Sequence, residues 1–193
     1  MRRVQRNEIM ELGAYEQIRE RFRARIIAEK KNRRFDVGDD MSIVFENHDT
    51  VLFQVQEMLR TERITSAPGI AHEIETYNDL IADADELSAT LFVEIPDKER
   101  RDRRLIELAG LERAVALEVN GALIPATFDE RSVLPDRTLA VHYLKFPLGV
   151  GSAARWEAAR DAVALVIRHP QLALRVPMPP AVFAALAQDL VAG

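Results

Sequence analysis

Hydrophobic residues recur every three to four positions in three stretches between residues 7 and 81, which is the spacing of an amphipathic helix. The first stretch predicts a helix from Asn7 to about Lys31, with Asn7 as its N-cap. The other two predict shorter helices at residues 49–63 and 70–81. Between them, Ser66-Ala-Pro-Gly69 is expected to interrupt the chain, because proline and glycine break helical structure.

A second group of segments is rich in β-branched and aromatic residues, which favours strands. These segments are residues 41–46, 87–94, 114–119 and 122–128. The last two form the clearest hairpin, because Asn120-Gly121 between them suits a type I′ turn. Residues 138–148 are apolar on both faces, as is typical of a central strand.

The remaining segments complete the expected architecture. Residues 96–109 predict a charged helix, and residues 171–176 are expected to extend the sheet. Helices are predicted at residues 153–168 and 179–190. The whole pattern predicts an α+β fold: a mostly antiparallel sheet of four to six strands, packed helices and a helical C-terminal flap. We expect a core domain at residues 1–148 and a helical extension at residues 149–193.

The composition excludes several classes of function. The chain of 193 residues is 48% hydrophobic and 30% charged, which is ordinary for a globular domain. It has no cysteine, so disulfides, thiolate zinc sites and cysteine nucleophiles are excluded. His, Asp and Glu would have to hold any metal, which favours Fe, Mn or Zn. The sequence shows neither a bilayer-spanning apolar run nor a signal peptide, so the cytoplasm is the expected compartment and no membrane contact is expected.

Charge is distributed unevenly along the chain. Residues 1–35 carry eleven Lys or Arg and five Glu, a balance of +6, whereas the rest carries fifteen basic and twenty-six acidic residues, a balance of −11. The basic segment either packs on the acidic body or contacts an acidic partner. Nucleic acid is a poor candidate partner, because few aromatic residues accompany the basic ones.

Candidate metal ligands gather on the third predicted helix. His72, Glu75 and Asp79 are spaced i, i+3 and i+7, so they share one ridge opposite the apolar stripe. One His and two carboxylates can supply two or three metal ligands if a second element completes the set. The alternative is a solvated polar face stabilised by local pairs.

The second predicted helix adds two carboxylates to this set. Glu62 falls within the arc of the apolar face, where a carboxylate must be paired, protonated or metal-bound. The alternatives are that the helix ends before Glu62 or that an arginine of the first helix pairs with it. Glu57 lies on the outer side, in a dense polar surface suited to a partner or ligand; this surface comprises Gln54, Gln56, Glu57, Arg60 and Arg63. His142 is expected to be a hydrogen-bonded core histidine, because its neighbours are apolar.

The chain resembles a bacterial family of unknown function. The resemblance is carried by Phe45-Glu46-Asn47 with Asp49-Thr50, by residues 54–62, by His72-Glu73 with residues 76–78, and by residues 87–94. Genes of this family tend to lie near those for rubrerythrin-like and iron–sulfur oxidoreductase proteins. The resemblance therefore implies an accessory role in redox or peroxide handling.

Two hypotheses follow for the function. In the first, the protein is a non-catalytic accessory or binding module that engages an oxidoreductase partner through the polar face of the second helix or through the basic first helix. In the second, it is a redox or hydrolytic protein that binds a metal through His72, Glu75 and Glu62, with Glu57 and Asp79 next. No spacing in the chain matches a catalytic signature, so no catalytic residue is assigned.

Overall fold

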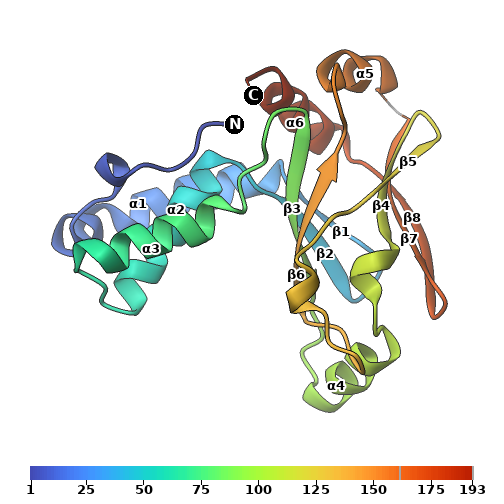
Figure 1. Ribbon diagram of the computed structural model, residues 1–193, viewed down its shortest axis with the longest axis horizontal. Coiled ribbons are helices and arrows are strands. Elements are labelled where there is room, and N and C mark those ends of the chain that lie inside the picture. Colours follow the sequence, from blue (N-terminus) through green and yellow to red (C-terminus); the bar gives the residue numbers. More distant parts are fainter. Residues whose placement is uncertain (161, 193) are drawn as a thin grey trace.

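The computed structural model describes residues 1–160 and 162–192. Within these residues, eight strands form two four-stranded antiparallel sheets, and helices pack beside and around them (Figure 1). The predicted α+β class is confirmed. The sequence pattern indicated a single sheet of four to six strands, whereas the eight strands form two sheets. Two sheets that pack face to face bury the apolar face of each against the other.

The first sheet has the order β1-β2-β3-β6. Its strands are β1 (Arg34–Asp36), β2 (Met41–Phe45), β3 (Glu86–Val93) and β6 (Val141–Pro147). Ile43, Leu91 and Leu144 belong to the inner face and are 0–1% exposed. Successive strand residues point to opposite faces, so the intervening positions, such as Ser88 and Tyr143, face the helical side of the molecule.

The second sheet has the order β5-β4-β7-β8. Its strands are β4 (Val115–Val119), β5 (Ala122–Pro125), β7 (Val163–His169) and β8 (Leu172–Pro177). Asn120 and Gly121 join β4 to β5 with φ values of 50° and 79°. Both central residues of a type I′ turn require positive φ, so this geometry confirms the predicted hairpin.

One hydrophobic core lies between the two sheets, and three helices cover its ends. These helices are α4 (Lys98–Glu107), α5 (Ser152–Ala159) and α6 (Pro180–Ala192). Trp156 of α5 stacks on Phe183 of α6 with ring centroids 5.2 Å apart. An isolated bridge between Thr127 and Lys145 ties the chain leaving β5 to β6, so the two sheets meet along one side. Short 3₁₀ turns lie at Arg6–Glu8, Leu111–Ala114 and Glu130–Ser132.

The remaining helices form a layer to one side of the first sheet (Figure 1). They are α1 (Leu12–Lys31), α2 (His48–Thr61) and α3 (Ala67–Asn78). This layer has its own apolar clusters, one between α1 and α2 around Phe22, and one between α2, α3 and the N-terminal segment around Val55. Both α2 and α3 lie in the stretch of chain between β2 and β3, which are neighbours in the sheet.

Two predicted helix starts are corrected by the structure. The first helix begins at Leu12 instead of Asn7, because the Gln56 side chain bonds both the N–H and the C=O of Met10 and holds the chain extended there. The third helix begins at Ala67 instead of Ile70. Ser66, expected within the break, is its N-cap and accepts a hydrogen bond from the Gly69 N–H, and proline is tolerated in a first turn.

The helix predicted at residues 153–168 is wrong over its second half. Helix α5 ends at Ala159, and Val163–His169 is strand β7; Asp161 lies outside the described residues. Residues 163–167 are all buried, between β4 and β8. A short continuous apolar run is compatible with a buried helix or a buried strand, so periodicity could not separate the two.

The strand predicted at residues 138–148 is β6, and it lies at the edge of its sheet instead of the centre. Its outward residues Val141 and Tyr143 are 37% and 52% exposed, so their apolar character is not explained by a covering layer.

Across the described residues, every helix is too short or too polar to cross a bilayer.

Candidate functional site

The candidate metal ligands are placed on the outside of the helical layer. His72 and Glu75 are exposed on α3, and Asp79 is the exposed C-cap of that helix. Glu62 is the exposed C-cap of α2, so the helix ends before this residue can face the core. Among residues 1–160 and 162–192, three or more His, Asp or Glu side chains nowhere converge in a geometry that could hold a metal ion.

Glu57, the fifth candidate, points inward to α1. Its carboxylate accepts hydrogen bonds from the Tyr15 hydroxyl at 2.7 Å and from two Arg19 nitrogens at 2.8 Å each. The Arg19 hydrogen bonds are the main cause that lowers the pKa of Glu57, although partial burial opposes them. Burial and the Glu57 carboxylate raise the pKa of Tyr15. The sequence placed Glu57 on an outer surface, whereas it joins α2 to α1.

The rest of the polar surface expected on α2 is also used within the chain. Gln56 is 1% exposed and bonds Met10, and Arg60 donates to Glu16 of α1 at 2.7 Å. Gln54 donates to Glu46 at 3.2 Å. Four of the five side chains of this surface therefore make contacts within the chain, whereas Arg63 is exposed and has no side-chain partner among the described residues.

Glu46, part of the Phe45-Glu46-Asn47 motif, is a buried carboxylate, and its burial was not predicted from the sequence. It is 2% exposed and accepts hydrogen bonds from the hydroxyls of Thr50 at 2.5 Å and Thr90 at 2.7 Å. Gln54 is its third donor, and all three donors are neutral side chains. Within the described part of the chain, Glu46 forms no ion pair. Its place directly after β2 and before the cap Asn47 was the available signal.

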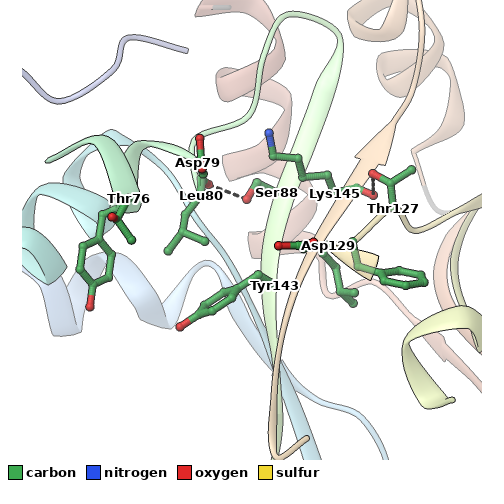
Figure 2. Close-up of a pocket in the computed structure, with 11 residues that line it drawn as sticks. Thr76, Asp79, Leu80, Ser88, Thr127, Asp129, Tyr143 and Lys145 are labelled. Atoms are coloured by element: carbon green, nitrogen blue, oxygen red, sulfur yellow. Dashed lines mark hydrogen bonds between the residues drawn. The ribbon is translucent and has the colours of Figure 1, made fainter. Parts of the chain in front are cut away.

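A cleft of about 440 Å³ lies between the end of α3, the outer face of the first sheet and the chain after β5 (Figure 2). Its walls come from four separate segments, and they include Tyr77, Asp79, Ser88, Phe128, Asp129 and Tyr143. In Figure 2 the Tyr143 ring points from β6 toward the helical layer. Two contacts fix the walls relative to one another. Ser88 Oγ of β3 donates to the Leu80 C=O at 2.5 Å, and the Thr127–Lys145 bridge joins the chain after β5 to β6.

Some of the charged side chains around this cleft form ion pairs, and Asp79 does not among the described residues. Lys145 Nζ lies 3.5 Å from a Glu86 carboxylate oxygen, and Asp129 binds Arg131 at 2.8 Å. Asp79 lines the same cleft, and none of the ion pairs of the described residues involves it. Burial is the main cause that raises the pKa of both Tyr77 and Tyr143, so both phenols remain neutral at physiological pH.

His142 has the environment predicted for it, a hydrogen-bonded position in the core. It is 7% exposed, and its Nε2 lies 3.0 Å from the Thr138 hydroxyl, which also donates to Glu112 at 3.0 Å. Burial lowers the pKa of His142, although the Glu112 carboxylate opposes this shift. With all three side chains buried, a substrate has no access to this cluster.

The second surface proposed from the sequence, the basic first helix, does remain exposed. Arg23, Ile27 and Lys30 recur at i, i+4 and i+7 on α1, and Lys31 adjoins them; we call these four residues the basic ridge. Ile27 is 46% exposed. In the part of the chain that the structure describes, the three cations of the basic ridge form no ion pair, whereas Arg19, Arg25 and Arg33 all do.

Comparison with known proteins identifies the family. Residues 3–190 match the family model described as protein of unknown function, DUF3501. The chain belongs to this family. A DUF3501 assignment agrees with the predicted resemblance to a family of unknown function. Among solved structures, the chain is similar to a novel protein of unknown function from Burkholderia pseudomallei K96243, with 33% identity and a TM-score of 0.89; the similarity covers 98% of this chain and 100% of that one. A search of curated proteins gives no match.

Proposed function

We propose that this protein is a non-catalytic accessory module that binds an oxidoreductase through the basic ridge of α1. The observation that carries the proposal is the contrast between the cations of this helix. Arg19 and Arg25 of α1 are bound to carboxylates of α2, whereas Arg23, Lys30 and Lys31 have no such partner in the described residues. Arg21 has none either, but only the basic ridge surrounds an exposed isoleucine, Ile27.

An acidic, partly apolar surface is the complement of the basic ridge. Cations on a rim steer association with an acidic partner and fix its orientation, and a central apolar side chain supplies buried area. Ile27 occupies that central position between Arg23 and Lys31. This arrangement supports a protein partner more than a small ligand, because a single exposed helix face has no enclosing walls.

The choice of partner rests on the family resemblance. Genes of such proteins tend to lie beside genes for rubrerythrin-like and iron–sulfur oxidoreductase proteins, which supports an accessory role in redox or peroxide handling. The partner proposed for the test is therefore the rubrerythrin-like protein of the same genome.

The test measures binding of that rubrerythrin-like protein by calorimetry at low and high salt. We expect Arg23→Glu with Lys31→Glu to weaken binding roughly tenfold or more at low salt, and salt to weaken the unmodified complex. Arg21→Glu is the matched control, because Arg21 is exposed on another side of the same helix. Two results would contradict the proposal. The first is binding that the double charge reversal leaves unchanged; the second is no binding to either the rubrerythrin-like protein or the iron–sulfur oxidoreductase of the same genome.

A metal-dependent redox or hydrolytic function is the second candidate. One observation favours it: His72 and Glu75 lie one turn apart on α3, both exposed and without side-chain hydrogen bonds among the described residues. Asp79 is one turn further, and a partner or a second copy would have to complete the ligand set for Fe, Mn or Zn. Glu57 and Glu62 contribute less to this proposal, since Glu57 is bound to Arg19.

Elemental analysis tests the metal proposal directly. The protein is purified without an affinity tag or chelator, alongside the variant with His72→Ala and Glu75→Ala. Near-stoichiometric metal that is lost in the variant would support the proposal. Metal that is unchanged in the variant, or the same trace amount in both proteins, would count against it.

A further inference from the structure

We propose that the cleft between α3 and β6 binds an organic cation: an ammonium group carried on an apolar body. This inference goes beyond the protein contact proposed for α1, because it concerns a different surface and a different ligand. It rests on three features of the cleft: its aromatic walls, the Asp79 carboxylate, which has no ion-pair partner among residues 1–160 and 162–192, and the carboxylates that already bind the nearby Lys145 and Arg131.

Aromatic side chains reach the cleft from three segments. Tyr77 comes from α3, Phe128 from the chain after β5, and Tyr143 from β6. Aromatic faces attract ammonium groups through the ring quadrupole. The Arg113 guanidinium already lies 5.2 Å from the centroid of the Phe128 ring, so we assign the ligand cation to the two tyrosines. Tyr143 is 52% exposed on the edge strand, so its ring is accessible to a ligand in the cleft.

Asp79 supplies the negative charge that such a ligand needs. It lies in the cleft wall close to Tyr77. Among the described residues it forms no ion pair, and its nearest cationic influence is Arg131, which is itself bound to Asp129. Two further carboxylates add to the negative field around the tyrosines: Glu73 lies near Tyr77, and the buried Glu46 lies near Tyr143.

The cations near the cleft already have partners. Lys145 faces Glu86 at 3.5 Å, and Arg131 binds Asp129 at 2.8 Å. An anionic ligand would have to displace one of these carboxylates and would also meet Asp79. A cationic ligand would displace nothing, so the electrostatics of the cleft favour a cation over an anion.

The dimensions suit one small organic molecule. A volume of about 440 Å³ lies within the range of roughly 300–1,000 Å³ that is typical of small-molecule sites. Leu80 and Phe128 contribute apolar surface for the body of the ligand. The geometry therefore assigns the ammonium group to the Asp79 and Tyr77 side and the apolar body to the Phe128 side.

Three benzene derivatives of similar size and different charge test this assignment. Benzylammonium, benzyl alcohol and benzoate are titrated into ¹⁵N-labelled protein, and the amide shifts of Thr127, Tyr143 and Lys145 are followed. We expect benzylammonium to shift these amides and to bind at least roughly tenfold more tightly than either other probe. N-acetyl-lysine methylamide is titrated alongside: if it binds more tightly than benzylammonium, the natural cation is a lysine side chain of a partner, and if it binds less tightly, the cation is a free amine.

Three variants make the test specific. Asp79→Asn should weaken benzylammonium binding roughly tenfold and leave benzyl alcohol unchanged. Tyr143→Leu should also weaken only the cation, because it keeps the apolar area and removes the ring. Asp83→Asn is the control, since Asp83 is exposed and binds Arg3 outside the cleft.

Several results would overturn the inference. Benzoate or benzyl alcohol binding as tightly as benzylammonium would show that charge is not recognised. Equal effects of Asp79→Asn and Asp83→Asn would show that any preference comes from the net charge of the protein. Unchanged amides with all probes would show that the cleft binds no ligand of this class.

Discussion

Arg33 and Asp189 lie 156 residues apart in the sequence, yet their side chains form two hydrogen bonds of 2.5 and 2.9 Å. Arg33 follows the end of α1, and Asp189 belongs to α6. The arginine is 4% exposed, and its third partner is Glu29, 2.7 Å away. A bidentate pair of this kind fixes both position and orientation, so it locks the helical layer against the C-terminal helix.

Asp189→Asn should therefore destabilise the protein by about 2–4 kcal/mol, because it leaves a buried guanidinium with one carboxylate instead of two. Urea denaturation followed by circular dichroism measures this change in the free energy of unfolding. Glu29→Gln is the comparison, and its effect should be smaller because the Glu29 side chain is 39% exposed. A larger loss in Glu29→Gln than in Asp189→Asn would refute this account of the pair.

Glu57 should make the stability depend on acid pH. Its pKa is lowered in the folded protein from an ordinary value of 4.5, mainly by Arg19. The stabilisation is therefore present above pH 4.5 and is lost as the pH falls through the lower folded value. Thermal unfolding of Glu57→Gln and the unmodified protein, measured from about pH 7 to about pH 3, should show curves that converge at low pH. A constant difference between the Glu57→Gln and unmodified curves would contradict the assignment.

His142 should act on stability in a higher pH range. Burial lowers its pKa below the ordinary 6.5, so the unfolded chain takes up a proton before the folded protein does. Stability should fall as the pH decreases through 6.5 toward the folded value. His142→Gln removes this proton uptake while keeping a polar group for Thr138. Its midpoint in urea should vary less with pH between about 7 and about 5 than that of the unmodified protein. An identical pH profile in the two proteins would argue against a buried neutral histidine.

Asn78 should hold the N-terminal segment in place. Its side chain accepts a hydrogen bond from the Val4 N–H at 2.8 Å and donates one to the Val4 C=O at 3.0 Å. Asn78→Ala should cost about 1–3 kcal/mol, because two buried backbone groups lose their partners. Hydrogen exchange at Val4 and Ile9 should accelerate in this variant more than exchange in β3. Thr76→Ala serves as the control, because Thr76 is exposed on the same helix and makes no hydrogen bond to this segment. Uniform acceleration across the protein would instead indicate global destabilisation.

Local signals in the sequence were enough wherever the structure is set by neighbouring residues. Asn120-Gly121 predicted its hairpin because positive φ is a property of those two residues. Asp97 likewise caps the start of the charged helix α4, although this helix ends at Glu107, two residues before the predicted end, and Gly110 begins the next 3₁₀ turn with a positive φ. In contrast, Val163–His169 could be recognised as a strand only from the two strands that flank it, which lie far away in the sequence.

The candidate site depended still more on distant contacts. Helical spacing correctly placed His72 and Glu75 on one exposed ridge, but it could not show that Glu57 meets Tyr15 and Arg19. That direction is decided by how α1 packs on α2. The cleft beside Tyr143 was equally hidden, because its walls come from four segments that no pattern along the chain connects.

The backbone N–H of Glu46 donates to the Ser88 C=O at 2.8 Å, so the stretch that carries α2 and α3 leaves the sheet and returns to it at one point. The stretch therefore adds two helices to the molecule without interrupting the pairing of β2 with β3. The cleft takes one wall from this segment and the others from the sheets. The position of α3, and with it this wall of the cleft, is therefore set relative to the sheet at the junction where β2 and β3 pair.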